Sequence, residues 1–137
     1  YRETGGSAFL ADIVEKPAVD ESFSVEYGDQ VIDWQYVEDI AQAFRKAAFA
    51  PEENLSQRIY NVRGEVASIR EAAEAVRSIM PDAEIEVSDE GELPWTQKLN
   101  MTDAQEDLGY EPEYDLETGF RKYIDALRAE EGLDSLE

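Results

Sequence analysis

The segment from Asp33 to Asp39 gathers polar and aromatic side chains at the point where a helix is about to begin. Gln35 lies between Trp34 and Tyr36. A side chain between two packed aromatics is held in place, and its amide can donate and accept hydrogen bonds, so Gln35 can bind a polar ligand. Tyr36 is a second candidate for ligand contact. The alternative for both aromatics is that they anchor the helix to the core.

Glu38 and Asp39 form a pair of carboxylates, which invites an acid–base interpretation. Their place in the first turn of the expected helix is explained by the helix dipole alone. His and Cys are absent from the sequence. This absence removes the commonest general base, thiol nucleophiles and the usual zinc ligands, and it excludes disulfides. We therefore expect no catalytic residue and no metal site in this chain.

Four further residues are candidates for substrate binding. Arg63 follows an expected strand, and strand-end loops are where α/β clefts gather polar groups, although a surface ion pair is the alternative. Trp95 and Lys98 lie in a segment of little periodicity and can form a mobile cover over a substrate, or simply pack. Arg2 lies near the first residue.

Acidic residues dominate the composition, with 33 Asp and Glu against 12 Lys and Arg and a net charge of −21. No cluster of Lys and Arg is present to displace counterions, so nucleic acid is not an expected partner. An anionic membrane surface would repel the chain, and no apolar run is long enough to span a bilayer. With no signal-peptide pattern, we expect a cytoplasmic protein. The first residue is Tyr1 rather than Met, which suggests a processed product or an excised piece.

The 137 residues, with 42% hydrophobic content, favour one folded domain. We expect it over residues 1–132, with a frayed tail at 133–137. The spacing of apolar residues, together with Gly, Pro and capping residues at element ends, predicts an α/β domain of about five helices and three or four short strands. The expected helices lie near 8–16, 36–48, 69–80, 103–108 and 116–131, and the expected strands near 23–27, 59–62 and 85–87.

Three local patterns set the details of these elements. Ser68 to Glu71 and Thr102 to Gln105 each have the sequence of a capping box, which satisfies the free N–H groups at a helix start. In the helix over 36–48, an apolar stripe is expected to face the core. Its members are Tyr36, Ile40, Phe44 and Ala47, widened by Val37, Ala41 and Ala48.

Two nucleotide-binding motifs are missing from the chain. The Gly5-Gly6 pair and Gly28 lack the spacing of a Gly-rich turn that holds a dinucleotide pyrophosphate. No phosphate-binding loop ending in Gly-Lys-Ser/Thr is present either.

Three blocks resemble successive segments of the extended short-chain dehydrogenase/reductase family, also called the NAD-dependent epimerase/dehydratase family. They are YGDQVIDWQYVEDIAQAF, RIYNVRGEVASIREAAEAV and NMTDAQEDLGYEPEYDLETGFRKYI. The blocks follow in the family's order, and the resemblance extends from Tyr1 to about Arg128. RETGG, NVRG and the LP before the last block are similar to an atypical subgroup whose substrates are poorly defined.

The resemblance implies the C-terminal, substrate-binding part of such an enzyme. The family's Rossmann half, which holds NAD or NADP and carries a Tyr-x-x-x-Lys catalytic pair, is absent from this sequence. Tyr1 is followed four residues later by Gly5, so it is not that tyrosine. We therefore expect this chain alone to be catalytically silent and to hold no cofactor. The resemblance also implies that the parent protein forms a homodimer through the missing half.

One position departs from the family pattern. In members that act on nucleotide sugars, an Arg before the Asp-aromatic pair binds the substrate diphosphate, and here that position is Ile32. Ile cannot supply the forked, charged hydrogen bonds of a guanidinium. Either another cation replaces it, with Arg2, Arg63 and Lys98 as candidates, or the substrate is not a nucleotide sugar.

Three functions remain open at this point. The first is the substrate-binding portion of an NAD(P)-dependent epimerase or dehydratase that acts on a nucleotide sugar or related sugar. The second is an oxidoreductase of the same family with a small hydroxy or sugar-acid substrate. The third is a non-catalytic acidic interaction domain.

The charge of −21 has two interpretations, a solvated acidic surface or an adaptation to the salty cytoplasm of a halophile. For the second, salt screens the repulsion between carboxylates, so the melting temperature should rise between low and molar KCl. Thermal unfolding at several salt concentrations measures it. An unchanged melting temperature would contradict the halophilic interpretation.

Overall fold

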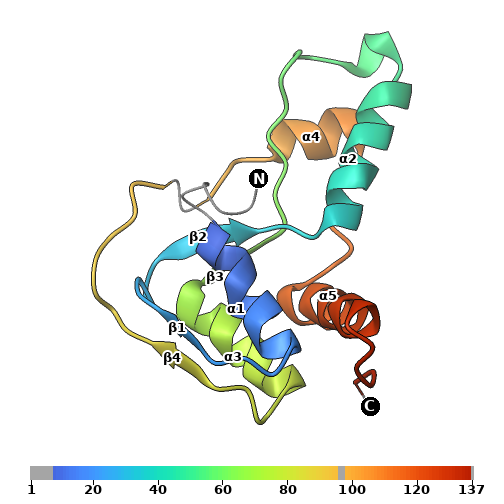
Figure 1. The fold of residues 1–137 in the computed structure, drawn as a ribbon. Helices are drawn as coiled ribbons and strands as arrows, with labels where there is room; N and C mark the ends of the chain where they lie inside the picture. The colour runs from blue at the N-terminus through green and yellow to red at the C-terminus, as the bar shows by residue number, and fades with distance from the viewer. Residues whose placement is uncertain (1–7, 96–97, 137) are drawn as a thin grey trace. The chain divides into compact units, whose positions relative to one another are not determined.

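The computed structural model describes residues 8–95 and 98–136 of the chain (Figure 1). These residues form five α-helices, one short 3₁₀ helix and four short strands, as the sequence predicts for an α/β chain. In chain order they are α1 (Ala8–Ala18), β1 (Phe23–Val25), β2 (Val31–Trp34), α2 (Val37–Phe49), η1 (Glu52–Asn54), β3 (Glu65–Ser68), α3 (Ile69–Ile79), β4 (Ile85–Val87), α4 (Thr102–Leu108) and α5 (Leu116–Glu130). Among the described helices, none combines the length and the apolar character needed to cross a bilayer.

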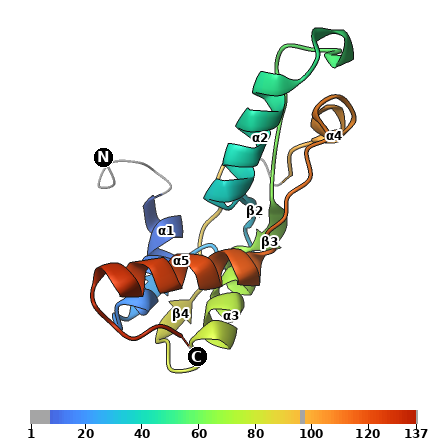
Figure 2. The ribbon, with the colours of Figure 1, turned by 90° about the vertical axis from the view of Figure 1, so that its right-hand side faces the viewer.

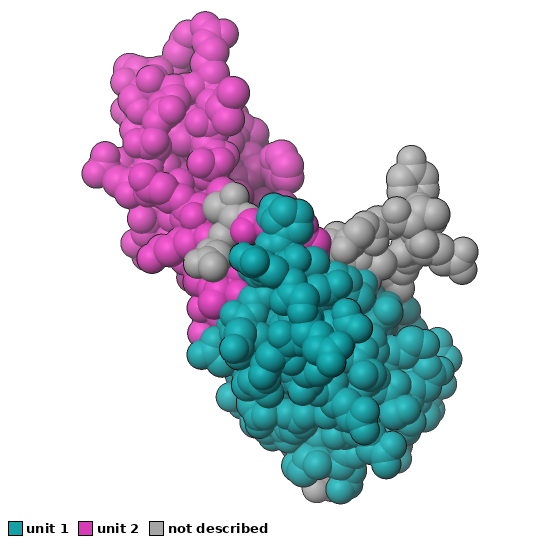
Figure 3. Space-filling view, turned by 90° about the vertical axis from the view of Figure 1, so that its left-hand side faces the viewer, with its two compact units in different colours: residues 1–30, 68–94, 116–137 teal, residues 31–67, 95–115 magenta. Residues whose placement is uncertain are grey.

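The contacts between Cα atoms group the chain into two compact units (Figure 3). Unit 1 comprises Tyr1–Gln30, Ser68–Pro94 and Leu116–Glu137, and unit 2 comprises Val31–Ala67 and Trp95–Asp115. The single domain expected over 1–132 stays a prediction. So does the frayed tail, in which the Leu136 N–H lies 3.1 Å from Asp125 Oδ1.

Unit 1 is a helical layer packed on a pair of parallel strands. β1 and β4 align Phe23 with Ile85 and Val25 with Val87. Helices α1, α3 and α5 contact one another beside this pair (Figure 2). The buried side chains come from every element of the unit: Ile13, Val14 and Ala18 from α1, Val25 from β1, Ile69, Ala72, Ala73, Val76 and Ile79 from α3, Ile85 from β4, and Ile124 from α5. The apolar residues that recur at helical spacing in the helices and at alternating positions in the strands are therefore buried in one core.

The capping box at the start of α3 is confirmed. The Glu71 N–H donates to Ser68 Oγ at 3.1 Å, and the Ser68 N–H donates to Glu71 Oε2 at 2.7 Å. The Ser68 hydroxyl also donates to Glu71 Oε2, at 2.9 Å. The hydrogen bonds from the Ser68 N–H and then from its hydroxyl lower the pKa of Glu71, so its carboxylate is ionised at the helix N-terminus at neutral pH. The arrangement satisfies the N–H groups that a helix start leaves free.

Unit 2 contains the β2–β3 pair, and here the strand prediction was partly wrong. Residues 59–62 form no strand, and the strand lies instead at Glu65–Ser68. Its partner β2 was not foreseen because its aromatic end was taken as the approach to a helix. Gly64 directly precedes β3, and a Cβ atom there would lie 2.1 Å from the Trp34 carbonyl oxygen, so any other residue would collide with β2.

The second predicted capping box is wrong, whereas the predicted end of the same helix is confirmed. Thr102 is the first residue of α4, and Asn100 Oδ1 accepts hydrogen bonds from the Thr102 N–H at 3.1 Å and from its Oγ1 at 2.8 Å. The capping oxygen thus comes from an earlier residue than the pattern suggested. Gly109 ends the helix with a φ of +62°.

The orientation predicted for α2 is also wrong. Phe44 and Val37 belong to the stripe expected to face the core, but they are 74% and 65% exposed. The buried residues of this helix are Asp39 and Ala43. The helix turns its polar side inward because that side hydrogen-bonds to the rest of unit 2, as described below.

Replacing Ile124 by Ala should test the core of unit 1. Ile124 is 0% exposed, and a buried Ile to Ala change lowers the free energy of unfolding by about 2–5 kcal/mol. Chemical denaturation monitored by circular dichroism measures the change. Glu130→Ala, at an exposed position of the same helix, is the control and should change stability by less than about 0.5 kcal/mol. Equal effects of the two substitutions would contradict the described packing.

Candidate functional site

Tyr110 is the centre of the hydrogen-bond network in unit 2. Its side chain is fully buried, in the segment that follows the left-handed turn at Gly109. Gln35 Nε2 donates to the Tyr110 hydroxyl at 3.1 Å, and this hydroxyl donates to the Arg63 carbonyl oxygen at 3.1 Å. The hydroxyl therefore joins the residue after β2 to the turn before β3.

Burial raises the pKa of Tyr110, and the negative charge of Asp39 acts in the same direction. The hydrogen bond from Gln35 and the charge of Arg63 act in the opposite direction, but the net shift is upward. The phenol is therefore protonated at neutral pH and available as a donor. It donates to the Arg63 carbonyl oxygen while it accepts from Gln35.

Arg63 holds the segment that precedes α4. Its Nε donates to the Leu99 carbonyl oxygen at 3.1 Å, and its Nη1 donates to the Gly64 carbonyl oxygen at 2.9 Å. The Leu99 N–H in turn donates to Asp33 Oδ2 at 3.1 Å. The backbone of Leu99 is thus bound on both sides. The second carboxylate oxygen of Asp33 is buried and has no hydrogen-bond partner within the described part of the chain.

Asp39 is 1% exposed and joins α2 to the segment before α5. Its carboxylate accepts hydrogen bonds from the Glu113 N–H at 2.8 Å and from the Tyr114 N–H at 3.3 Å. The rings of Tyr36 and Tyr114 lie beside this contact, with centroids 4.7 Å apart and planes at 52°. The helix dipole is therefore not the only reason for a carboxylate here, because Asp39 also satisfies two backbone donors.

A second polar cluster lines an open hollow of about 640 Å³ in unit 2. Ser56 and Tyr60 are among its lining residues, and both donate to Asp107 Oδ2, Ser56 from its N–H at 2.8 Å and its Oγ at 2.6 Å, and Tyr60 from its Oη at 2.7 Å. These hydrogen bonds, led by the one from the Ser56 hydroxyl, lower the pKa of Asp107. Burial, followed by the hydrogen bond to Asp107, raises the pKa of Tyr60.

The structure brings together only part of the predicted set. Gln35 and Arg63 meet through Tyr110, while Tyr36 precedes α2 and contacts Tyr114. Trp95 is half-buried, Lys98 is exposed, and Arg2 lies outside the described residues. The binding of a ligand by these six residues stays a prediction.

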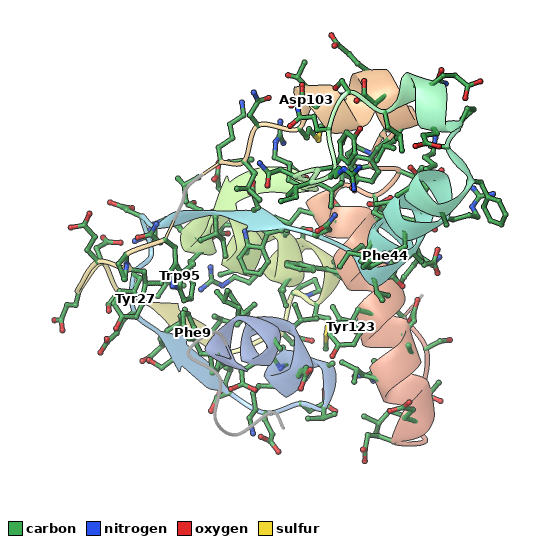
Figure 4. All side chains as sticks on the ribbon, turned by 90° about the horizontal axis from the view of Figure 1, so that it is seen from above. Phe9, Tyr27, Phe44, Trp95, Asp103 and Tyr123 are labelled. Carbon is green, nitrogen blue, oxygen red and sulfur yellow. The ribbon has the colours of Figure 1, made fainter. Side chains whose placement is uncertain are left out.

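Sequence reasoning missed Tyr110, Asp39 and the cluster around Asp107. Tyr110 had a signal, because an aromatic residue directly after a Gly that ends a helix commonly returns to the core. The sequence signal for Asp107 was weaker. Asp103 and Asp107 are four residues apart, which places both carboxylates on one face of α4 (Figure 4 labels Asp103). Gln57 Nε2 donates to Asp103 beside this cluster.

Two observations on the described residues concern a metal and a dinucleotide. No group of three or more His, Cys, Asp or Glu side chains there could hold a metal ion. A dinucleotide pyrophosphate binds at a helix that starts directly after a strand, and β3 leads directly into α3. That helix start is occupied by the ionised Glu71, which would repel a phosphate. The start of α3 therefore does not fit a coenzyme pyrophosphate.

Comparisons with known proteins identify the fold. No protein-family model matches the chain, and no curated protein matches it. Among solved structures, L-threonine 3-dehydrogenase from Trypanosoma brucei matches 98% of this chain with a TM-score of 0.82 and 20% sequence identity. GalE-like L-threonine dehydrogenase from Cupriavidus necator matches 94% with a TM-score of 0.76 and 22% identity. UDP-glucuronic acid 4-epimerase from Bacillus cereus, in complex with a UDP-sugar and NAD, matches 85% with a TM-score of 0.72 and 18% identity.

These likenesses establish the fold, which is that of the C-terminal part of GalE-like dehydrogenase and epimerase structures. This chain covers 45% of the Trypanosoma brucei enzyme and 49% of the Cupriavidus necator enzyme. It therefore spans about half the length of these neighbours.

Replacing Tyr110 by Phe should destabilise unit 2. The change leaves the Gln35 amide and the Arg63 carbonyl without their partner, which costs about 1–3 kcal/mol for buried polar groups. Denaturant unfolding measures the loss. Tyr114→Phe is the matched control, because its hydroxyl bonds to Glu38 at the exposed surface and its loss should cost less than about 0.5 kcal/mol. A neutral Tyr110→Phe variant would show that the network carries no stability.

Proposed function

We propose that this chain is the substrate-binding part of an NAD(P)-dependent oxidoreductase of the extended short-chain dehydrogenase/reductase family. Its substrate in this proposal is a small polar hydroxy compound. Two findings support the proposal, the three sequence blocks in family order and the match of nearly the whole chain to L-threonine dehydrogenase structures.

The environment of Ile32 is the observation that favours a small substrate over a nucleotide sugar. Ile32 is 5% exposed, so this position of β2 contributes to the core and offers no cation for a diphosphate. Arg63, a candidate replacement, already donates to two backbone carbonyl groups. A diphosphate buried without a cationic partner would cost several kcal/mol. A small hydroxy compound carries less negative charge than a diphosphate, so its burial costs less.

Gln35 is the residue that we propose as the main contact to this substrate. It gives one N–H to the Tyr110 hydroxyl, and a Gln amide has a second N–H and a carbonyl oxygen. Because Tyr110 is buried, the amide is held at a fixed position. Tyr36 and Arg63 lie in the same unit and are proposed as supporting contacts, with Trp95 and Lys98 as parts of a cover. Arg2 stays a further candidate for substrate binding.

The coenzyme in this proposal, NAD or NADP, is bound by polypeptide other than this chain, which alone is inactive. When bound, it would accept a hydride from the carbon that carries the substrate hydroxyl. The parent protein is proposed to form a homodimer through that other polypeptide.

A nucleotide sugar is the second candidate substrate. The Bacillus cereus epimerase, whose structure contains a UDP-sugar and NAD, shares the fold over 85% of this chain. In that case Arg2 or Lys98 would have to bind the diphosphate. A third candidate, a non-catalytic acidic interaction domain, is favoured only by the charge of −21.

Enzymatic assay of the complete product of the encoding gene separates these functions. We expect NADH or NADPH to form with L-threonine or another small hydroxy acid, and no detectable binding of UDP, UDP-glucose or UDP-glucuronate by calorimetry. Gln35→Ala should reduce kcat/KM at least tenfold, while Gln42→Ala, at another amide of unit 2, should leave it within about twofold. Tight binding of UDP would favour the nucleotide-sugar function. Failure to bind either coenzyme would favour the interaction domain.

A further inference from the structure

The open hollow of unit 2 is lined by the loop that follows α2 and by the end of α4 (Figure 1). Its volume of about 640 Å³ lies within the range of roughly 300–1,000 Å³ that is typical of small-molecule sites. Leu55 from the loop and Leu108 from α4 contribute apolar surface, and Ser56 and Tyr60 contribute polar groups. The lining includes none of the six candidate substrate-binding residues. The proposed function therefore makes no use of this hollow.

Hydrogen bonds fix the polar wall of the hollow to α4. Ser56 Oγ and Tyr60 Oη donate to Asp107 Oδ2 at 2.6 and 2.7 Å. Between them in the sequence, Gln57 Nε2 donates to Asp103. A wall that is already ordered loses little conformational entropy when a ligand binds, so the loop is prepared for binding before the ligand arrives.

Two oppositely charged side chains line the same hollow without pairing. Glu52 and Arg58 are both exposed. Neither side chain forms an ion pair or a hydrogen bond with another of the described residues. The sequence contains 33 acidic residues for 12 basic ones, and Arg58 nevertheless has no carboxylate partner in the described chain. Both charged groups are therefore available to a ligand.

The two charges select the chemistry of that ligand. A guanidinium binds a carboxylate through paired, charged hydrogen bonds, and a carboxylate accepts hydrogen bonds from an ammonium group. An α-amino acid carries a carboxylate and an ammonium group on one carbon atom, so it can bridge Arg58 and Glu52. The net charge of −21 would repel an anion, and Arg58 would repel a cation, whereas a zwitterion has no net charge.

We propose that the hollow binds a free α-amino acid with an apolar side chain, such as leucine. Arg58 binds its carboxylate, Glu52 binds its ammonium group, and Leu55 and Leu108 contact its side chain. Because ion pairs at exposed positions are weak, the dissociation constant lies in the millimolar range. This site does not depend on the proposed function.

NMR titration of the complete gene product tests the class of ligand. L-Leucine carries both charged groups, isocaproate lacks the ammonium group, and isoamylamine lacks the carboxylate. We expect L-leucine to shift the amide signals of residues 55–58 saturably, and each analogue to bind about fivefold more weakly. The absence of a saturable shift with L-leucine in the millimolar range would overturn the proposal. Equal affinity for L-leucine and either analogue would also overturn it, because a single charged group would then be sufficient.

Four variants test the two charged residues. Arg58→Gln and Glu52→Gln each remove one charge and should raise the Kd for L-leucine about fivefold. Arg45→Gln and Glu53→Gln remove the same charges at exposed positions that do not line the hollow, and they should change this Kd by less than about twofold. Circular dichroism confirms that each variant is folded. Equal Kd values for either variant and its matched control would show that the charge does not contact the ligand, which refutes the proposed site.

Discussion

The buried hydroxyl of Tyr110 is the interaction on which the order of unit 2 depends. Few large side chains are buried in this unit, so apolar packing alone defines its loops poorly. The hydroxyl fixes Gln35 on one side and the Arg63 backbone on the other, and the Arg63 side chain then fixes Leu99. The segments at Gln35, Arg63 and Leu99, which are distant in sequence, are thereby linked to the Tyr110 hydroxyl. A buried hydrogen-bond network is stable only while its donors and acceptors remain paired. The phenol must therefore keep its proton, because the Tyr110 hydroxyl donates it to the Arg63 carbonyl oxygen.

The two units use different physical means to reach a defined structure. Unit 1 buries aliphatic side chains from three helices and two strands, and its stability follows the usual relation between apolar burial and free energy. Unit 2 relies on side chains that bind backbone groups, as Asp39 does for the segment at Glu113 and Asp33 does for Leu99. Directional bonds of this kind position a binding surface more sharply than apolar contacts do. Gln35 and Arg63, two of the candidates for substrate binding, lie in this unit.

The sequence predicted the elements whose signals are local. The helix starting after Ser68 was identified from its capping box, the alternation around Val25 and Ile85 identified two strands, and Gly109 marked a helix end. The failures concern information that is not local. The strand at Glu65–Ser68 depends on pairing with β2, and the orientation of α2 depends on whether an apolar or a polar surface lies opposite. Periodicity defines an apolar stripe but not what covers it.

The same limit applies to the candidate site. Gln35 and Arg63 were predicted from residue type and position, because polar groups next to aromatics and in strand-end loops commonly serve binding. Their link through Tyr110 spans 75 positions between Gln35 and Tyr110, which no pattern of short range can reveal. The buried role of Asp39 was hidden because an acidic residue in a first helical turn has a sufficient local explanation.

The order of the segments along the chain bears on how the protein is made. The chain passes between the units after Gln30, Ala67, Pro94 and Asp115, so neither unit is a continuous stretch. In unit 1, β1 pairs with β4, and both α1 and α3 pack on α5, which follows all the other elements of the unit in the sequence. The core of unit 1 therefore cannot be completed until α5 has left the ribosome. Until then its aliphatic surfaces stay open, and the many carboxylates of the nascent chain keep neighbouring polypeptides apart.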